Sequence, residues 1–237
     1  MSFLGNIFTT KRSVGLQGFT DWHCHILPGV DDGVESLDES LLILSQYEQL
    51  GIKKVWLTPH IMEDIPNTTA NLRERFDELK TAYQGNIELN LAAENMMDGL
   101  FAERLAAGDV LPIGDEKNTL LVETSYFNAP TGLLDTLESI TKAGYYPLIA
   151  HPERYTYVYD MDTYRQWKQL GAKLQLNLFS LSGHYGSEAK DKAEALLKNG
   201  MYDRVGSDLH HERHLGILKY LKLNDKTFTL LKTLMLE

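Results

Sequence analysis

The sequence is poor in cysteine: Cys24 is the only one in 237 residues. A single cysteine excludes an intramolecular disulfide and a zinc site built from several thiolates. No apolar run approaches the roughly 18 residues that a membrane-spanning helix needs. The N-terminal residues also lack the basic-then-apolar order of a signal peptide. We therefore expect a cytoplasmic protein that does not insert into membranes.

Basic residues are scarce relative to acidic ones. There are 23 Lys and Arg against 33 Asp and Glu, which gives a net charge of −10. This acidity disfavours nucleic acid as a partner, and with it an accessory role beside a DNA polymerase. Apolar residues make up 43% of the chain and charged residues 24%, which is typical of a globular protein and excludes a disordered one.

Short β-rich runs alternate with longer stretches of helical pattern from residue 20 onward. The predicted strands are Thr20–His25, Lys54–His60, Ile87–Glu94, Thr119–Glu123, Tyr146–His151, Lys173–Phe179 and Asp203–Asp208. The first helix is predicted to begin after Ser36, which forms a capping box with Glu39, and to end at Gly51. Its leucines 37, 41 and 44 recur with helical spacing and predict the buried face.

Alternating strands and helices predict an α/β protein with a parallel sheet covered by helices. No GxGxxG turn follows the first strand, which disfavours an open dinucleotide-binding sheet. The number of strand–helix units, about seven, is near the eight of a closed barrel. We therefore predict a single barrel domain of seven strands over residues 19–237. Residues 1–18 precede it as an extension, in which Phe3, Leu4, Ile7 and Phe8 could dock or form a free tail.

Ionisable residues recur where the predicted strands end. They are His23 and His25 in the first strand, then His60, Glu94, Glu123, His151 and Asp208 at later strand ends, and His210 just beyond. Only the strand Lys173–Phe179 ends without an obvious ligand. Because all strand ends of a barrel meet at one mouth, these side chains are expected to share one pocket.

The segment His23-Cys24-His25 places two imidazoles on one face of a strand, because side chains alternate along it. Two imidazoles on one face can hold a metal ion. Cys24 points to the other face, and Val30 stands where a cysteine-dependent phosphatase has arginine, six positions after the nucleophile. We therefore predict that Cys24 is a packing residue.

Imidazoles mixed with carboxylates are typical of open catalytic sites for zinc, manganese or iron. The candidates are too many for one ion, so two or three ions bridged by carboxylates fit better. Such clusters activate water and clamp the oxygens of a displacement at phosphorus. Arg154 and Arg213 follow predicted ligands and are candidates to grip phosphate. Aromatic side chains near the mouth either pack against a substrate ring or fill loops; they are Tyr126, Phe127, Tyr155, Tyr157 and Tyr159.

The segment 21–33, which contains the pattern HxHxxPGxDDG, resembles the opening motif of the PHP (polymerase and histidinol phosphatase) superfamily. Segments 57–60, 149–155 and 206–210 agree with it, the second of them containing HPER. Together they are most similar to the branch of metal-dependent bacterial protein-tyrosine phosphatases associated with capsule and exopolysaccharide export.

The resemblance implies a distorted TIM-like (β/α)7 barrel with three divalent ions, manganese first and iron or zinc as alternatives. The implied metal ligands are His23, His25, Asp32, His60, Glu94, Glu123, His151, Asp208 and His210. Asp31, beside the ligand Asp32, would support the site. Arg154 and Arg213 would contact the phosphoryl group. The implied substrate is a phosphotyrosine protein, namely a bacterial tyrosine kinase that controls capsule or exopolysaccharide synthesis.

The expected reaction is in-line attack on phosphotyrosine by a hydroxide that bridges two ions. Two other enzyme classes stay open: a PHP phosphoesterase acting on a small ester such as histidinol phosphate, and a metal-dependent amidohydrolase. Glu94 and Glu123 on the middle strands disfavour the amidohydrolase, which often has a bridging lysine there. A non-catalytic binding module is disfavoured because every ligand position carries a plausible ligand.

Overall fold

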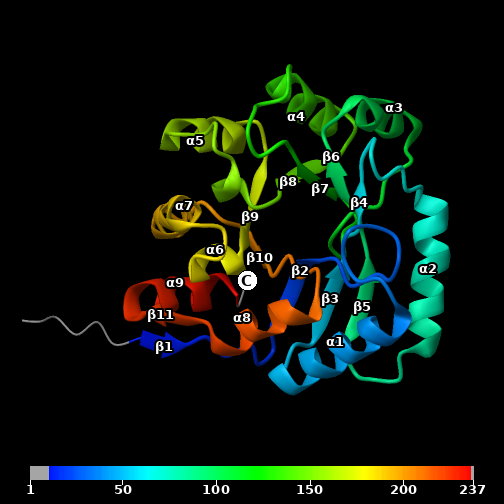
Figure 1. The fold of residues 1–237 in the computed structure, drawn as a ribbon. Coiled ribbons are helices and arrows are strands. Elements are labelled where there is room, and N and C mark those ends of the chain that lie inside the picture. Colours follow the sequence, from blue (N-terminus) through cyan, green and yellow to red (C-terminus); the bar gives the residue numbers. More distant parts are fainter. Residues whose placement is uncertain (1–10, 236–237) are drawn as a thin grey trace, which may run out of the picture.

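The computed structural model describes residues 11–235, in which helices surround a curled sheet of parallel strands (Figure 1). The strands of this sheet are β2 (Thr20–Cys24), β3 (Lys54–Leu57), β4 (His60–Ile61), β5 (Glu88–Leu91), β6 (Glu94–Met96), β7 (Thr119–Glu123), β8 (Tyr146–Ile149), β9 (Lys173–Asn177) and β10 (Arg204–Gly206). They pair in the orders β2-β3-β5 and β10-β9-β8-β7-β6-β4. Because β4 follows β3 directly and β6 follows β5, the strands occupy the seven predicted positions.

The barrel closes between its first and last strands. Cys24 of β2 forms a parallel bridge with Leu209, just after β10. Two backbone hydrogen bonds continue this contact: His25 N donates to Leu209 O at 2.8 Å, and Asp208 N donates to His23 O at 2.7 Å. This closure brings the two ends of the sequence pattern, histidines 23 and 25 and Asp208, side by side.

The barrel is distorted where the second and third strand positions are interrupted. Pro59 separates β3 from β4 and has no N–H to donate to the ladder. The carbonyl of Pro59 accepts a hydrogen bond from Glu94 N at 3.1 Å. Parallel pairing then resumes between β4 and β6. β5 is therefore an edge strand of its sheet. An isolated antiparallel bridge joins Ile113 to Thr119 of β7. The predicted distorted TIM-like barrel is thus confirmed.

The helices cover the outside of the sheet (Figure 1). They are α1 (Leu37–Leu50), α2 (Thr69–Ala82), α3 (Gly99–Ala107), α4 (Leu133–Lys142), α5 (Met161–Gln169), α6 (Leu178–Ser182), α7 (Ser187–Lys198), α8 (Leu215–Tyr220) and α9 (Asp225–Leu234), with 3-10 turns η1 (Pro152–Arg154) and η2 (Glu212–His214). The predicted ends of α1 are confirmed: Ser36 accepts from Glu39 N, and Gly51 adopts a left-handed φ of 85°. Among residues 11–235, no helix is both long and apolar enough to cross a membrane.

The buried face of α1 differs from the predicted one. Leu44 is buried, but Leu37 is 37% exposed. The helix instead buries Ser40 and Tyr47, each with a hydrogen-bond partner: Ser40 Oγ donates to Ile26 O at 2.7 Å, and the Tyr47 hydroxyl donates to a buried carboxylate. Leucine spacing does not reveal this face, because polar side chains are buried wherever a partner satisfies them.

Residues 11–18 pack against the body of the protein. β1 (Lys11–Ser13) pairs antiparallel with β11 (Lys222–Asn224), and Val14 and Leu16 are buried in the core. Residues 11–18 of the predicted extension therefore pack against the barrel and do not form a separate segment. The boundary at residue 18 stays a prediction, and Phe3, Leu4, Ile7 and Phe8 lie outside the described residues.

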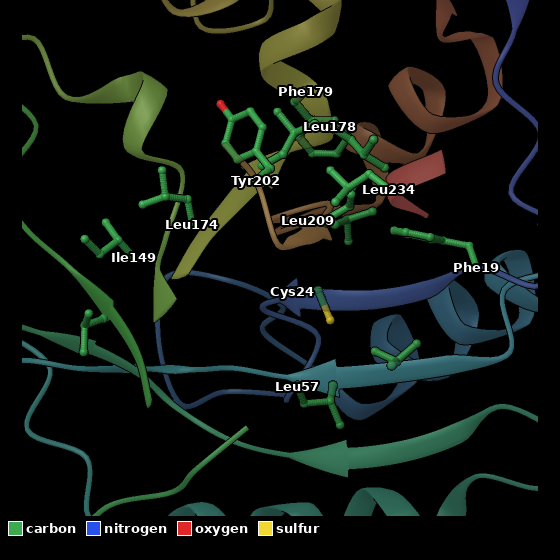
Figure 2. Packing of buried hydrophobic residues seen from close by; sticks show 14 of the residues in the cluster. Phe19, Cys24, Leu57, Ile149, Leu174, Leu178, Phe179, Tyr202, Leu209 and Leu234 are labelled. Carbon is green, nitrogen blue, oxygen red and sulfur yellow. The ribbon is translucent and has the colours of Figure 1, made fainter. Parts of the chain in front are cut away.

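Cys24 belongs to the apolar layer of the core. Figure 2 shows it among buried side chains that include Leu57 and Leu209. The thiol is fully buried, Sγ lies 3.5 Å from Trp56 O, and burial raises the pKa of Cys24 well above its usual value. A buried neutral thiol is a poor nucleophile, so the predicted packing role is confirmed.

Candidate metal centre

The nine side chains predicted as metal ligands come together at the carboxyl ends of the strands. Their donor atoms form four overlapping groups, and within each group the atoms lie within 4.8 Å of one another. The groups are His25, Asp32, His60 and His210; His23, His25 and Glu94; His23, His151 and Asp208; and His60, Glu94 and Glu123. All members except Asp32 and His210 are buried. The barrel therefore assembles one cluster from residues spread over most of the chain.

Glu94 lies at the centre of this cluster. Its Oε1 is 3.0 Å from His151 Nε2. Its Oε2 is 3.1 Å from His23 Nε2, 3.3 Å from His25 Nε2 and 3.2 Å from His60 Nδ1. A carboxylate whose two oxygens face different imidazoles is placed to bridge two metal ions.

Three of the histidines are oriented by contacts through the other ring nitrogen. The Nδ1 atoms of His23, His25 and His210 lie 3.0, 2.8 and 2.9 Å from Gln175 Oε1, Asp31 Oδ2 and the carbonyl of Asp208. Because these partners accept hydrogen bonds, each Nδ1 donates to its partner and each Nε2 is directed at the cluster, where it can bind a metal ion once it is deprotonated. Metal-binding histidines are typically oriented in this way.

The adjacent aspartates 31 and 32 occupy different positions. Asp31 Oδ2 accepts hydrogen bonds from His25 Nδ1 and, at 3.0 Å, from the backbone N of His60. Asp32 Oδ1 instead lies 3.6 Å from His60 Nε2 and 3.5 Å from His210 Nε2. Asp31 thus orients the ring of His25 and the backbone at His60. Asp32 instead faces the Nε2 atoms of His60 and His210.

The spacing of the cluster suits divalent ions. Ligand atoms about 2.1 Å from one ion lie about 3.0–3.4 Å apart in octahedral or tetrahedral geometry. The contacts around Glu94 span 3.0–3.3 Å. Among the described residues, three buried atoms of predicted ligands form no hydrogen bond: His60 Nδ1 and Glu123 Oε1, which lie 3.0 Å apart as an ion pair, and His151 Nδ1. Buried polar atoms normally have partners, and a bound cation would supply them. The residues present therefore fit a metal centre.

The carboxylates of the cluster are held in the charged form that metal binding requires. Burial raises the pKa of Glu94, but His23 and His60 outweigh burial and keep it well below its usual range. Burial acts in the same way on Asp208, and His23 with His210 again lowers its pKa further than burial raises it. The site is thus rich in anionic oxygens that little solvent reaches.

Two ligand positions have strained backbone. His151 and Asp208 adopt positive φ angles of 32° and 56°, and they are two of only three non-glycine residues that do so within residues 11–235. Such conformations cost free energy for L residues and persist where the surrounding structure demands them. Each lies two residues after the end of a strand, β8 or β10, where the chain turns at the mouth of the barrel.

Arg154 borders the cluster in a fixed orientation. Its guanidinium carbon lies 4.3 Å from the ring centroid of Tyr126 and 4.0 Å from that of Tyr185. One nitrogen, NH1, donates to Asp208 Oδ2 at 2.7 Å, and the side chain is 16% exposed. Arginine has five N–H donors, so most of those of Arg154 remain available to an anion at the mouth of the barrel.

Arg213, the other predicted phosphate contact, lies in η2 with an exposed side chain. Its neighbour His214 accepts a hydrogen bond from the backbone N of His210 at 3.3 Å, which ties this turn to the cluster. The phosphate-binding role of Arg213 therefore stays a prediction.

The predicted aromatic residues divide between packing and exposure. Tyr155 is fully buried, and the Tyr157 hydroxyl lies 2.7 Å from Thr124 Oγ1, so both hold the loops together. Phe127 and Tyr159 are 73% and 83% exposed.

Two residues of β9, Gln175 and Asn177, were missed by the sequence analysis. Gln175 Oε1 accepts from the backbone N of His151 as well as contacting His23 Nδ1. Asn177 Nδ2 donates to Asp208 Oδ2 at 2.8 Å. The one signal in the sequence was that this strand ends without a charged ligand. Its amide side chains instead hold the ligands of neighbouring strands.

Comparison with known proteins gives a family and several relatives. Residues 19–216 match the family model for capsular polysaccharide synthesis, CpsB/CapC. The tyrosine-protein phosphatase YwqE of Bacillus subtilis is 29% identical over 81% of this chain and 77% of its own. The putative tyrosine-protein phosphatase CapC of Staphylococcus aureus is 27% identical over 87% and 82%, and the tyrosine-protein phosphatase CpsB of Streptococcus pneumoniae is 27% identical over 81% and 82%.

Solved structures share the fold. A chain from the crystal structures of YwqE and CpsB, described as unique metal-dependent tyrosine phosphatases, matches with a TM-score of 0.77 at 24% identity over 90% of this chain and 86% of its own. The phosphotriesterase homology protein of Escherichia coli matches more distantly, with a TM-score of 0.50 at 16% identity over 92% of each chain. The family match covers most of the barrel and confirms the resemblance seen in the sequence motifs. This chain belongs to the CpsB/CapC family of capsular polysaccharide synthesis.

Proposed function

We propose that this protein is a metal-dependent protein-tyrosine phosphatase. The observation that carries the proposal is the joint placement of nine imidazole and carboxylate ligands around Glu94 with Arg154 at their edge. Relatives with this fold are named tyrosine-protein phosphatases, and one structure is described as metal-dependent.

The metal centre would be held by His23, His25, Asp32, His60, Glu94, Glu123, His151, Asp208 and His210. We propose three divalent ions, with manganese first and iron or zinc as alternatives, because carboxylates and imidazoles suit all three metals. Bound ions would supply an activated water and neutralise charge on the phosphoryl oxygens.

The residues of this chain would bind and orient the phosphoryl group. Arg154 is fixed between Tyr126 and Tyr185, so its free N–H groups meet the equatorial oxygens without a further loss of side-chain freedom. Arg213 would add a second cation from the exposed turn. Tyrosine leaves as a phenolate whose ordinary pKa is about 10, so the reaction asks little of a general acid.

The proposed substrate is a phosphotyrosine protein, and more narrowly a bacterial tyrosine kinase that controls capsule or exopolysaccharide synthesis. Membership of a capsular polysaccharide synthesis family supports this choice. A phosphotyrosine side chain carries its phosphate at the far end of the ring, away from the peptide backbone, which suits a cluster of mostly buried ligands.

The test is phosphate release from a phosphotyrosine peptide, with Mn²⁺, with chelator and with vanadate, beside histidinol phosphate as a competing substrate. We expect release that needs Mn²⁺, stops with chelator and is little affected by vanadate. Preference for histidinol phosphate would reassign the protein to small phosphate esters. Activity that survives chelation would overturn the metal-dependent proposal altogether.

A further inference from the structure

Asn177, at the end of β9, makes separate contacts with each end of its amide. Its Oδ1 accepts from Phe179 N at 2.8 Å and so caps the short helix α6. Its Nδ2 donates to Asp208 Oδ2 at 2.8 Å, in a fully buried setting. The backbone N of Asn177 is fixed in turn by the buried Glu153 Oε1 at 3.0 Å. The amide is therefore held firmly on one side and offers its donor to Asp208 on the other.

The two oxygens of Asp208 have different surroundings. Oδ1 lies 3.4 Å from both His23 Nε2 and His25 Nε2, on the side of the proposed ions. Oδ2 accepts from Asn177 Nδ2 and from Arg154 NH1. With its backbone strained at a φ of 56°, Asp208 depends on these donors to keep Oδ1 directed at the imidazoles.

Tyr185 joins the same network from the other side. Its ring centroid lies 4.0 Å from the guanidinium carbon of Arg154, which also contacts the ring of Tyr126. Its hydroxyl is 3.3 Å from Asn177 Nδ2 and 3.4 Å from Asp208 Oδ2. A guanidinium that contacts two rings and donates to a carboxylate through one nitrogen has few orientations left.

We propose that Asn177 and Tyr185 are positioning residues with divided tasks. Asn177 directs the Asp208 carboxylate at the metal ion, and Tyr185 directs the Arg154 guanidinium at the phosphoryl group. This inference rests on the proposed function for the phosphoryl half only. The metal half concerns the binding of ions and is measured without any substrate.

The metal half is tested with Asn177→Ser, because serine can still cap α6 but has no amide donor. The matched control is Asn224→Ser, since Asn224 caps α9 through Thr227 N far from the cluster. We expect Mn²⁺ affinity, measured by calorimetry on the metal-free chain, to fall about 10–100-fold for Asn177→Ser and to stay unchanged in the control. Affinity within twofold of wild type would overturn the role of Asn177.

Should the serine variant not fold, Asn177→Asp serves instead. It keeps the capping oxygen and the shape of the side chain but replaces the donor with an oxygen facing Asp208 Oδ2. Folding is checked by circular dichroism. A folded Asn177→Asp chain that binds Mn²⁺ as wild type does would equally overturn the proposal.

The phosphoryl half is tested with Tyr185→Leu and Tyr185→Phe, with Tyr220→Leu as control because Tyr220 is 77% exposed in α8. We expect Tyr185→Leu to weaken binding of inorganic phosphate to the Mn²⁺-loaded protein about tenfold, with Mn²⁺ affinity within about threefold of wild type. Tyr185→Phe, which keeps the ring, should restore phosphate binding. A phenylalanine variant as weak as the leucine variant would contradict the stacking role.

The outcomes separate this inference from the proposed function. A wild-type chain that hydrolyses no phosphotyrosine would end the proposed function. The Asn177 inference would still stand if Asn177→Ser lost Mn²⁺ affinity, and it would fall if that affinity were kept.

Discussion

His23 Nε2 and His25 Nε2 face each other at 3.1 Å inside the barrel. The Nδ1 atoms of both rings lie beside hydrogen-bond acceptors, so both Nε2 atoms are directed at the cluster. Both also lie 3.1 and 3.3 Å from Glu94 Oε2, so either protons or a metal ion must lie between these nitrogens and the carboxylate. The alternation of side chains through β2 and the residue after it thus brings two of the nine proposed ligands together.

Replacing His151 should remove both metal and activity. His151→Ala deletes an imidazole that contacts Glu94 Oε1, and we expect activity on a phosphotyrosine peptide to fall at least about 100-fold with less bound metal, as measured by elemental analysis. His151→Asn serves as a second variant, because asparagine tolerates the left-handed backbone. His184→Ala, at an exposed histidine, is the control. Full metal content in both His151 variants would refute the ligand role.

Arg154→Ala should lower kcat about 10²–10³-fold while metal content stays unchanged. The reason is that, under the proposed function, Arg154 would contact the phosphoryl group, whereas Asn177 would still hold Asp208 Oδ2 after the arginine is removed. Arg165→Ala, which removes a surface ion pair, provides the comparison. If Arg154→Ala lost its metal or its fold, Arg154 would be a structural residue.

Cys24→Ser should remain active to within about threefold, because Cys24 belongs to the apolar core and not to the cluster, and a serine hydroxyl of similar size can donate to Trp56 O. Activity and thermal unfolding are measured together. Complete loss of activity in a folded, metal-loaded Cys24→Ser chain would restore the cysteine as a nucleophile.

The metal-free chain should lose stability as the pH rises from about 6.5 to about 9. Burial and His25 lower the pKa of His60, but Glu94 and Glu123 outweigh them and raise it from 6.5 to about 9. A group whose pKa is raised by folding contributes its full stabilisation below the unfolded pKa and loses it as pH passes the folded pKa. The Tm should therefore fall by several degrees across this window.

The titration of His210 changes the stability of the metal-free chain in the opposite direction, and it does so below pH 6.5. Burial and the charge of His25 lower its pKa to about 4, so its contribution is complete above 6.5 and is lost only as the pH falls toward 4. The His60 prediction is checked by calorimetry of the metal-free and Mn²⁺-loaded chains from pH 6.5 to pH 9.5, a range in which His210 contributes no change. A Tm of the metal-free chain that rises over this range would show that the carboxylates do not hold His60 in its charged form.

The sequence by itself was enough for the fold class and for the candidate ligands. Alternation of strands and helices predicts a parallel sheet, and about seven such units without a GxGxxG turn predict a barrel. Ligands placed at strand ends, such as His60 and Glu123, must then meet because parallel strands present the same end to one mouth. Burial of Cys24 followed equally from its position between two histidines on a strand.

Only the tertiary structure decided how those ligands are held. His23 and Gln175 are 152 positions apart, and their contact exists because the barrel closes between β2 and β10. The pairing of β9 with β10 brings Asn177 to Asp208, and the segments that follow β7 and α6 bring two tyrosine rings to Arg154. Neutral amides and rings of this kind have no distinctive spacing in a sequence. Their roles depend on hydrogen bonds and stacking over a few ångströms between strands that are distant along the chain.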